Sequence, residues 1–196
     1  MLQSNLRDIS ILQTKNEGFS VSREYLSLLE KYNINFVRVY QNEIVGPAAG
    51  MIRLIEETYK SCRPQKVADI FAGSLGYSQV CSRLGAAKID AYDLQIKNYY
   101  SENTKLQILE KDLLTISGST FSNYDLIIAE PPRKYHLLFL NSLPQFLNKS
   151  MLLFRIGSID YSEHLSDCRK ICAAKFSTKK WSMVNLYSEA YIKMED

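Results

Sequence analysis

An apolar segment followed at once by a turn of small residues is the feature that most constrains the fold of this chain. Val67 to Gly76 reads V-A-D-I-F-A-G-S-L-G, and Tyr77 to Leu84 then reads as a helix. A strand, a tight turn and a helix in this order form the first unit of an open α/β sheet, whose ligands bind beyond the carboxyl ends of the strands. The pattern therefore predicts a ligand site at the end of this strand.

From residue 66 onward, short apolar runs alternate with helical segments. The runs expected to be strands are Val67–Phe71, Ile89–Tyr92, Leu106–Leu109, Leu126–Ala129 and Met151–Ile156. The segments expected to be helices are Tyr77–Leu84, Ile96–Lys105, Tyr135–Leu147 and Ser162–Ala174. This alternation predicts an α/β fold in which helices cover both faces of a mostly parallel sheet. Near the end, Trp181–Leu186 and Ala190–Met194 are expected to pair as an antiparallel hairpin around Tyr187-Ser188-Glu189.

The first 45 residues lack this alternation, so we expect a small N-terminal extension, residues 1–45, before one domain of residues 46–196. A short hairpin is expected from Ile9–Gln13 and Phe19–Val21, which flank Asn16-Glu17-Gly18. Ser22 is typical of a helix N-cap, and it precedes the helical segment Arg23–Tyr32.

Two further elements lead into the first core strand. The β-forming side chains of Asn35–Tyr40 predict a strand. Pro47 suits the first turn of a helix, and apolar residues recur at helical spacing over Pro47–Lys60. We therefore expect a helix with one apolar face here.

The composition is that of one ordinary globular domain, with 46% hydrophobic and 23% charged residues among 196. A net charge of +3 is compatible with a nucleic-acid partner, and also with many other partners. No apolar stretch approaches the roughly 18 residues of a membrane span. The N-terminus lacks the apolar core of a signal peptide. We therefore expect a cytoplasmic protein that does not engage a membrane.

The cysteines and histidines do not form a recognisable metal-binding pattern. Cys168 and Cys172 are spaced C-x3-C in an expected helix, and no second pair completes a zinc site. Free buried thiols are the simpler interpretation. The two histidines, His136 and His164, stand apart in the sequence and are expected to have structural or surface roles.

The turn itself restricts the kind of ligand. Gly73 and Gly76 permit tight turning and close approach of the backbone to a ligand. A dinucleotide fingerprint needs G-x-G-x-x-G, but Leu75 replaces its second glycine and Ser78 its third, and the G-K-[ST] of a P-loop is absent. S-adenosylmethionine carries no phosphate and tolerates this looser turn.

Acidic residues follow the next two expected strands. Asp93 closes the second strand, where a carboxylate can accept hydrogen bonds from both ribose hydroxyls. Asp112 follows the third strand and can accept a hydrogen bond from an adenine amine. A strand-ending surface acid and an ordinary helix start are the alternatives at these two positions.

Together these residues resemble the class I S-adenosylmethionine-dependent methyltransferases, nearest to those that methylate amines of nucleic acids. The resemblance covers about Gly46 to Ile192 and implies a Rossmann-like sheet with strand order 3-2-1-4-5-7-6. Matching the family residue by residue implies that the cofactor is S-adenosylmethionine. The implied cofactor-binding residues are Asp69, Phe71, Ala72, Gly73, Ser74, Gly76, Asp93, Leu94, Asp112 and Leu113.

A second motif, A-E-P-P-R-K-Y at Ala129 to Tyr135, follows the fourth strand. Amino-methyltransferases carry [D/N]-P-P-[Y/F/W] there. The acid or amide and a proline-region carbonyl orient the amine, and the aromatic ring stacks on an extruded base. Glu130 and Arg133 depart from that pattern, and Tyr135 is the candidate replacement ring. A uridine C5-methyltransferase with D-P-P-R is excluded, because the stretch at the end of the fifth strand, F-R-I-G-S-I-D-Y, contains no cysteine nucleophile.

The resemblance implies Glu130, Pro131, Pro132 and Tyr135 as catalytic residues. Candidate substrate contacts are Arg133 and Lys134, with Lys179, Lys180 and Trp181 as further basic and aromatic residues for a nucleic acid. A rigid turn after a buried strand is the alternative for the E-P-P-R segment, and solvated surface is the alternative for the lysines.

Three functions stay open at this point. The first is transfer of a methyl group to an exocyclic amine of RNA or DNA, with RNA favoured. The second is a cofactor-binding but catalytically impaired subunit, and the third is a small-molecule methyltransferase. The N-terminal extension can serve as a substrate lid or as a surface for a protein partner, and the oligomeric state is open.

Overall fold

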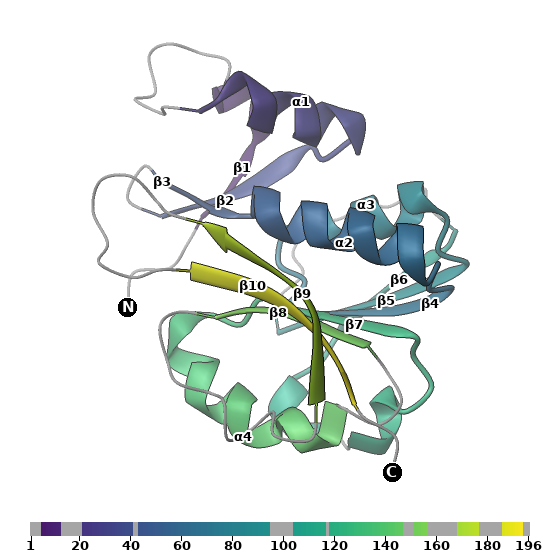
Figure 1. Ribbon diagram of the computed structural model, residues 1–196. Coiled ribbons are helices and arrows are strands. Elements are labelled where there is room, and N and C mark those ends of the chain that lie inside the picture. The colour runs from purple at the N-terminus through teal and green to yellow at the C-terminus, as the bar shows by residue number, and fades with distance from the viewer. Residues whose placement is uncertain are drawn as a thin grey trace.

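The alternating apolar runs build a central sheet of seven strands. The computed structural model describes residues 5–12, 21–40, 43–94, 104–116, 118–146, 151–156, 168–176 and 186–193. The strands of this sheet are β4 (Lys66–Ile70), β5 (Lys88–Asp93), β6 (Leu106–Glu110), β7 (Leu126–Ala129), β8 (Met151–Ile156), β9 (Cys168–Phe176) and β10 (Leu186–Lys193). They lie in the order β6-β5-β4-β7-β8-β10-β9 (Figure 1), which is 3-2-1-4-5-7-6 when counted along the chain.

Strand direction changes at one edge of this sheet. The pairs β6–β5, β5–β4, β4–β7 and β7–β8 are parallel, whereas β10 pairs antiparallel with both β8 and β9. The five expected core strands are therefore confirmed, and so is the α/β class. Because β4 has neighbours that come later in the chain on both sides, strand order reverses at its carboxyl end, where α/β folds bind ligands.

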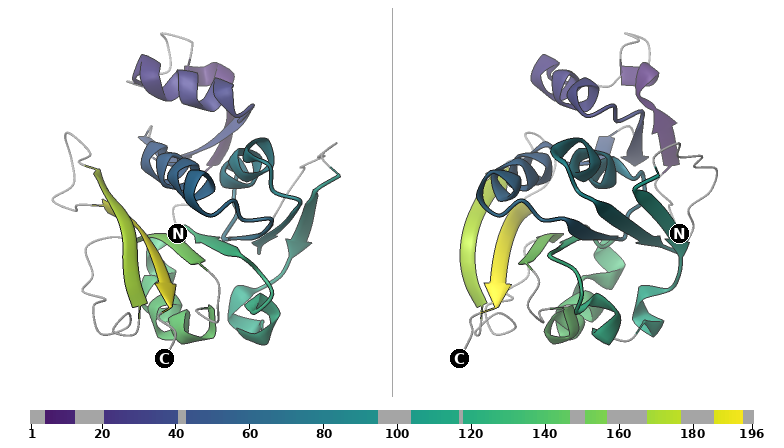
Figure 2. Two further views of the ribbon diagram at one scale, coloured as in Figure 1. Left: turned by 45° about the vertical axis from the view of Figure 1, so that its right-hand side comes forward. Right: turned by 90° about the vertical axis from the view of Figure 1, so that its right-hand side faces the viewer.

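Helices cover both faces of the sheet (Figures 1 and 2). On one face lie α2 (Ala49–Ser61) and α3 (Gly76–Leu84), and on the other lie α4 (His136–Phe146) and the short 3-10 segments η2 (Leu113–Thr115), η3 (Gly118–Phe121) and η4 (Arg133–Tyr135). Alternate residues of a strand face opposite layers. Val67 accordingly packs with the α2 and α3 side, and Ala68 with the α4 side.

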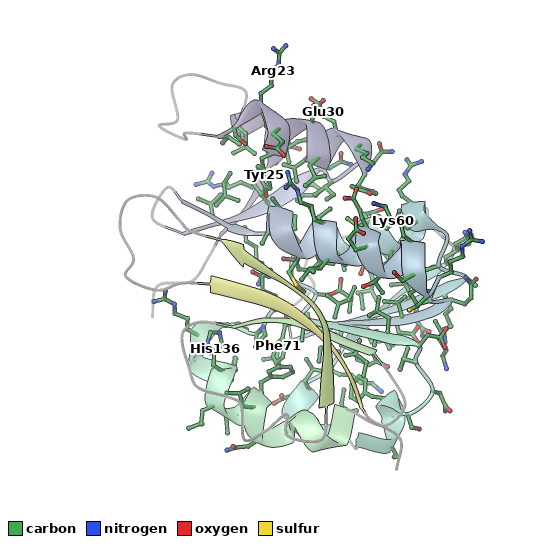
Figure 3. The ribbon with its side chains drawn as sticks, viewed as in Figure 1. Arg23, Tyr25, Glu30, Lys60, Phe71 and His136 are labelled. Carbon is green, nitrogen blue, oxygen red and sulfur yellow. The ribbon has the colours of Figure 1, made fainter. Side chains whose placement is uncertain are left out.

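The N-terminal segment forms a second, three-stranded antiparallel sheet. Its elements are β1 (Asn5–Asp8), η1 (Ile9–Leu12), α1 (Arg23–Lys31), β2 (Phe36–Tyr40) and β3 (Glu43–Gly46), with strand order β1-β2-β3. The Ser22 hydroxyl caps α1 by accepting the Tyr25 backbone N–H at 3.1 Å, as expected. The Tyr25 hydroxyl donates to the Pro47 carbonyl at 2.6 Å, and Figure 3 shows Tyr25 between α1 and α2.

The two sheets share one hydrophobic core. Leu29 and Val37 of the N-terminal segment belong to the same buried cluster as Met51 and Ile55 of α2. The boundary between residues 45 and 46 stays a prediction, although β3 continues to Gly46. The N-terminal segment therefore packs onto the sheet domain, in a position where its side chains can reach the end of β4.

Several expected elements are wrong. Ile9–Leu12 forms a 3-10 turn rather than a strand of a hairpin. The helix expected over Pro47–Lys60 is present as α2, but it begins at Ala49, so Pro47 precedes its first turn. Residues 168–176 form strand β9 rather than a helix. Tyr187-Ser188-Glu189 lies inside β10, opposite Ile156, Arg155 and Phe154 of β8, so it is not a turn.

The physical reason lies in long-range pairing. The segment C-R-K-I-C-A-A-K-F tolerates a helix by local preference, but β10 offers it a long antiparallel partner.

Most of Ile96–Lys105, the Asn16-Glu17-Gly18 turn and residues 177–185 lie outside the described residues. No helix in the described ranges is both long enough and apolar enough to cross a membrane.

Candidate functional site

The bend between β4 and α3 has an unusual backbone. Phe71, Gly73 and Leu75 have φ values of 59°, 49° and 58°, in the left-handed region. A glycine adopts this conformation freely, whereas Phe71 and Leu75 do so at a cost. Left-handed non-glycine residues cluster where the surrounding structure holds the backbone for function. The bend is therefore held in one shape by its contacts.

Leu75 of the bend and Asp69 of β4 hold the bend in place. Leu75 is 2% exposed and packs against Ala72 of the bend and Ala91 of β5, so its side chain anchors the bend to the neighbouring strand. Asp69 accepts hydrogen bonds from the backbone N–H and the hydroxyl of Ser78, at 3.0 and 2.6 Å. Burial raises the pKa of the Asp69 carboxyl to about 7. A contact of Asp69 with a cofactor stays a prediction, and its observed role is to tie the strand end to α3.

Asp93 lies at the bend, as the sequence predicts. Its Oδ2 accepts the backbone N–H of Gly73 at 2.8 Å, and the neighbouring backbone N–H of Ala72 donates to the carbonyl of Tyr92 at 3.0 Å. The ends of β4 and β5 are thus joined side by side. An ionised carboxylate offers about four acceptor positions, so the contact with Gly73 is compatible with binding ribose hydroxyls as well.

The remaining predicted cofactor residues surround these strand ends. Leu94 is 44% exposed directly after β5, and Ser74 is buried within the bend. After β6, the carbonyl of Asp112 accepts hydrogen bonds from the N–H and hydroxyl of Thr115, and Leu113 is buried in the core on the α4 side. A Cβ on Gly76 would lie 2.7 Å from a ring carbon of Pro47, so α3 begins in close contact with the entry to α2.

Glu130 lies at the end of β7 and makes contacts that the sequence did not indicate. The hydroxyl of Tyr77 donates to its Oε2 at 2.6 Å and accepts the backbone N–H of Ala48 at 2.9 Å. A guanidinium nitrogen of Arg38 lies 3.8 Å from the same oxygen. The Glu130 side chain is 11% exposed. Its carboxylate is therefore held between α3 and the N-terminal sheet.

The carbonyl of Pro131 is also engaged. His136 Nε2 lies 3.0 Å from that oxygen, at the start of α4. Burial lowers the pKa of His136, so the neutral imidazole, donating from Nε2, is the form that fits this contact. Pro132 is exposed, and its carbonyl accepts the backbone N–H of Tyr135 at 2.8 Å. The two prolines thus form an ordered turn after β7.

Aromatic rings adjoin this turn. The ring of Tyr135 stacks on Phe71 with centroids 6.3 Å apart and planes inclined by 21°, and Phe139 meets Phe71 edge-on at 6.1 Å. Figure 3 shows Phe71 and His136 between the sheet and α4. Arg133 is exposed, and Lys134 Nζ lies 4.4 Å from the Tyr135 ring centroid. The candidate base-stacking ring is therefore present beside the bend, already paired with one ring of the protein.

Sequence reasoning missed three residues of this site: Arg38, Tyr77 and His136. An arginine between two valines in a strand was the available signal for Arg38, since alternate residues face opposite sides. Nothing local marks Tyr77 or His136. Lys179, Lys180 and Trp181 lie outside the described residues. Among the described residues, no group of three or more histidine, cysteine or acidic side chains gathers as a metal site.

Comparison with known proteins supports the fold. No protein-family model matches the sequence, and no curated protein matches it significantly. The structure is similar to a "putative RNA methyltransferase" from Pyrococcus horikoshii, with a TM-score of 0.60 and 14% identity over 90% of this chain and 100% of that one. It is also similar to the N-methyltransferase NodS from Bradyrhizobium japonicum, with a TM-score of 0.55 and 11% identity over 74% of this chain and 95% of that one.

A third similar structure is a "putative methyltransferase" crystallised with S-adenosylhomocysteine, with a TM-score of 0.55 and 12% identity over 79% of this chain. This chain covers 53% of that longer protein. These likenesses establish the Rossmann-like methyltransferase fold that the sequence motifs implied.

Proposed function

We propose that this chain is an S-adenosylmethionine-dependent methyltransferase that acts on an exocyclic amine of a nucleic-acid base, with RNA favoured over DNA. The observation that carries the proposal is the 2.8 Å hydrogen bond from the Gly73 N–H to Asp93, with Glu130 and its two prolines following the adjacent strand β7. Gly73 of the predicted cofactor bend, the predicted ribose acid Asp93 and the predicted acceptor residue Glu130 therefore lie at one edge of the sheet, which supports the proposal.

The shape of the bend supports a contact with the methionine and ribose parts of the cofactor. Gly73 carries no side chain at φ 49°, and the Leu75 side chain is buried against Ala72 and Ala91. Asp93 ends β5 and Asp112 follows the adjacent strand β6, which supports the proposed contacts of Asp93 with ribose and of Asp112 with adenine. The neighbour crystallised with S-adenosylhomocysteine has this same fold, which supports the assignment of cofactor class.

The chemistry requires alignment more than activation. Adenosylmethionine supplies a methyl group on a positively charged sulfur. In our proposal Glu130 and the Pro131 carbonyl accept the N–H groups of the amine and direct its lone pair. The amine nitrogen forms the new N–C bond, the S–C bond breaks toward sulfur, and the amine loses one proton to solvent. Tyr135 supplies the face on which the base stacks.

A catalytically impaired, cofactor-binding subunit is the second candidate. The observation that favours it is that the two acceptors already have protein partners: Tyr77 donates to Glu130, and His136 lies at hydrogen-bond distance from the Pro131 carbonyl. In this alternative the E-P-P-R turn is structural, and the N-terminal sheet or another surface serves a protein partner. Small-molecule methylation is the third.

Two measurements separate these candidates. Calorimetry with adenosylmethionine and adenosylhomocysteine tests cofactor binding, with Asp93→Ala expected to weaken both. Transfer of a labelled methyl group to total RNA, genomic DNA or a metabolite extract, followed by mass spectrometry of the product, identifies the acceptor. We expect Glu130→Ala to lower transfer to RNA about 100-fold or more, as loss of an orienting contact does, while the exposed Glu30→Ala leaves it unchanged. Binding without any transfer would favour the impaired subunit.

A further inference from the structure

Arg38 brings a positive charge from the N-terminal sheet to the bend. It lies in β2 between Val37 and Val39, which are buried on the opposite face of the strand. A Cβ on Gly73 would lie 2.6 Å from the guanidinium carbon of Arg38 and 2.8 Å from its Nε. A side chain at position 73 would therefore displace the guanidinium, and the absence of one lets Arg38 pack directly on the bend.

One donor of the guanidinium is unsatisfied in this position. Within the described residues, Nε of Arg38 is buried without a hydrogen-bond partner. The contact with Glu130 is 3.8 Å long, which exceeds hydrogen-bond distance. A guanidinium carries five N–H donors, and buried donors left without partners are costly. An anion bound at the bend would complete these contacts.

We propose that Arg38 binds the carboxylate at the methionine end of adenosylmethionine, so that the N-terminal sheet completes the cofactor site. The inference rests on the proposed cofactor. A planar guanidinium matches a carboxylate with two parallel hydrogen bonds. Gly73 contacts Arg38 on one side and Asp93 through its N–H, so one ligand on the bend reaches both its carboxylate partner and its ribose partner.

A second consequence concerns Glu130. Because Arg38 lies near both the bend and Glu130 Oε2, a ligand carboxylate competes with Glu130 for the same guanidinium. Cofactor binding therefore loosens the hold of Arg38 on Glu130 and makes that carboxylate a better acceptor for an incoming amine. The cofactor is expected to bind before the methyl acceptor.

Binding of a carboxylate-free ligand tests the inference without any turnover. The probes are adenosylhomocysteine and its analogue in which hydrogen replaces the carboxylate, each titrated calorimetrically into the full chain. Arg38→Met should weaken adenosylhomocysteine about 10- to 100-fold, as expected for loss of charge-assisted hydrogen bonds, and should change the affinity of the analogue less than about threefold. Arg38→Lys keeps the charge without the fork and should fall between wild type and Arg38→Met.

The exposed Arg23→Met, on α1, is the matched control and should bind both ligands as wild type does (Figure 3). An equal loss for both ligands in Arg38→Met and Arg38→Lys would mean that Arg38 acts through the fold, and would overturn the inference. So would an unchanged affinity for both. A loss of RNA affinity alone would assign Arg38 to a phosphate instead. If Arg38→Met weakens adenosylhomocysteine but not the analogue, and the wild type transfers no methyl group, the inference stands and the proposed activity is wrong.

Discussion

The hydroxyl of Tyr77 donates a 2.6 Å hydrogen bond to Oε2 of Glu130 while accepting the backbone N–H of Ala48. One phenol thereby connects the helix after the bend, the entry to α2 and the motif after β7. Glu130 is consequently positioned by the fold before any ligand arrives. The strength of that connection can be measured.

Removing the Tyr77 hydroxyl should lower the free energy of unfolding less when the side chain at position 130 is uncharged. Tyr77→Phe should lower the free energy of unfolding by about 1.5–3 kcal/mol in wild type, because a hydrogen bond to a charged acceptor is lost. In a Glu130→Gln background the same change should cost about 0.5–1.5 kcal/mol, the range of a neutral hydrogen bond. Urea unfolding of the four proteins measures the difference.

Tyr124→Phe is the matched control for that cycle. Its hydroxyl donates to the buried carboxylate of Asp90 at 2.6 Å and belongs to the core on the α4 side. Its cost should be the same with Glu130 or Gln at position 130, since separate sites add. If Tyr77→Phe costs the same in both backgrounds, the Tyr77–Glu130 contact does not position the carboxylate.

Stability should fall as pH rises because of Asp69. Burial raises the pKa of this carboxyl from 3.8 to about 7 in the folded chain. Between these values the folded state binds more protons than the unfolded state. The stability that protonated Asp69 contributes is therefore present at pH 4 and is lost as pH rises through 7. The loss is on the order of 4 kcal/mol at full ionisation. Asp69→Asn should flatten this slope and raise the melting temperature at pH 8.

The exposed Glu30→Gln, on α1, provides the comparison for Asp69→Asn in the same thermal melts and should keep the wild-type slope (Figure 3). A wild-type slope in Asp69→Asn would place the ionisation elsewhere.

The elements that sequence predicted well are those fixed by local pattern. β4, the bend and α3 follow from an apolar run, small residues and a helical stripe that are contiguous in the chain. Asp93 could be placed at the bend because parallel neighbouring strands bring their carboxyl ends to one edge. The same reasoning located Glu130 at the end of β7.

What sequence could not predict depends on partners far along the chain. β9 became a strand because β10 pairs with it, although its own residues allow a helix. Arg38 reached the bend because a second sheet packs on α2 and directs one face of β2 toward Gly73. Neither the choice of strand partner nor the docking of one sheet on another is encoded within a local window.

A methyl group at position 73 should conflict with Arg38. Gly73→Ala places Cβ 2.6 Å from the guanidinium carbon of Arg38. It also forces alanine to φ 49°, and this backbone strain costs roughly 1–2 kcal/mol. In an Arg38→Ala background the collision is gone and the backbone strain alone should remain. We therefore expect Gly73→Ala to cost more in wild type than in Arg38→Ala, as measured by urea unfolding.

Gly85→Ala supplies the strain-only control. Gly85 has φ 106°, and nothing lies within 4 Å of a Cβ there. Its cost should be the same with or without Arg38. Equal costs of Gly73→Ala in the two backgrounds would show that Arg38 moves aside freely, and that its packing on the bend contributes little to stability.

His136 should titrate below the usual histidine range. Burial lowers its pKa from 6.5, and its Nε2 lies 3.0 Å from the Pro131 carbonyl. Since the folded state resists protonation, the stability that His136 contributes is present above pH 6.5 and lost as pH falls below it. This slope is opposite to that of Asp69, so the Asp69→Asn background isolates it.

Proton NMR measures this pKa directly. The chain has two histidines, so in a His164→Gln variant the remaining imidazole signal belongs to His136. We expect its midpoint below 6.5, and we expect His136→Gln, which keeps a neutral donor, to lose the acid-side slope in stability. A midpoint at or above 6.5 would mean that the imidazole is stabilised as a cation beside the Pro131 carbonyl. The turn after β7 would then be held by a charged donor, and its geometry would persist to lower pH than our structure implies.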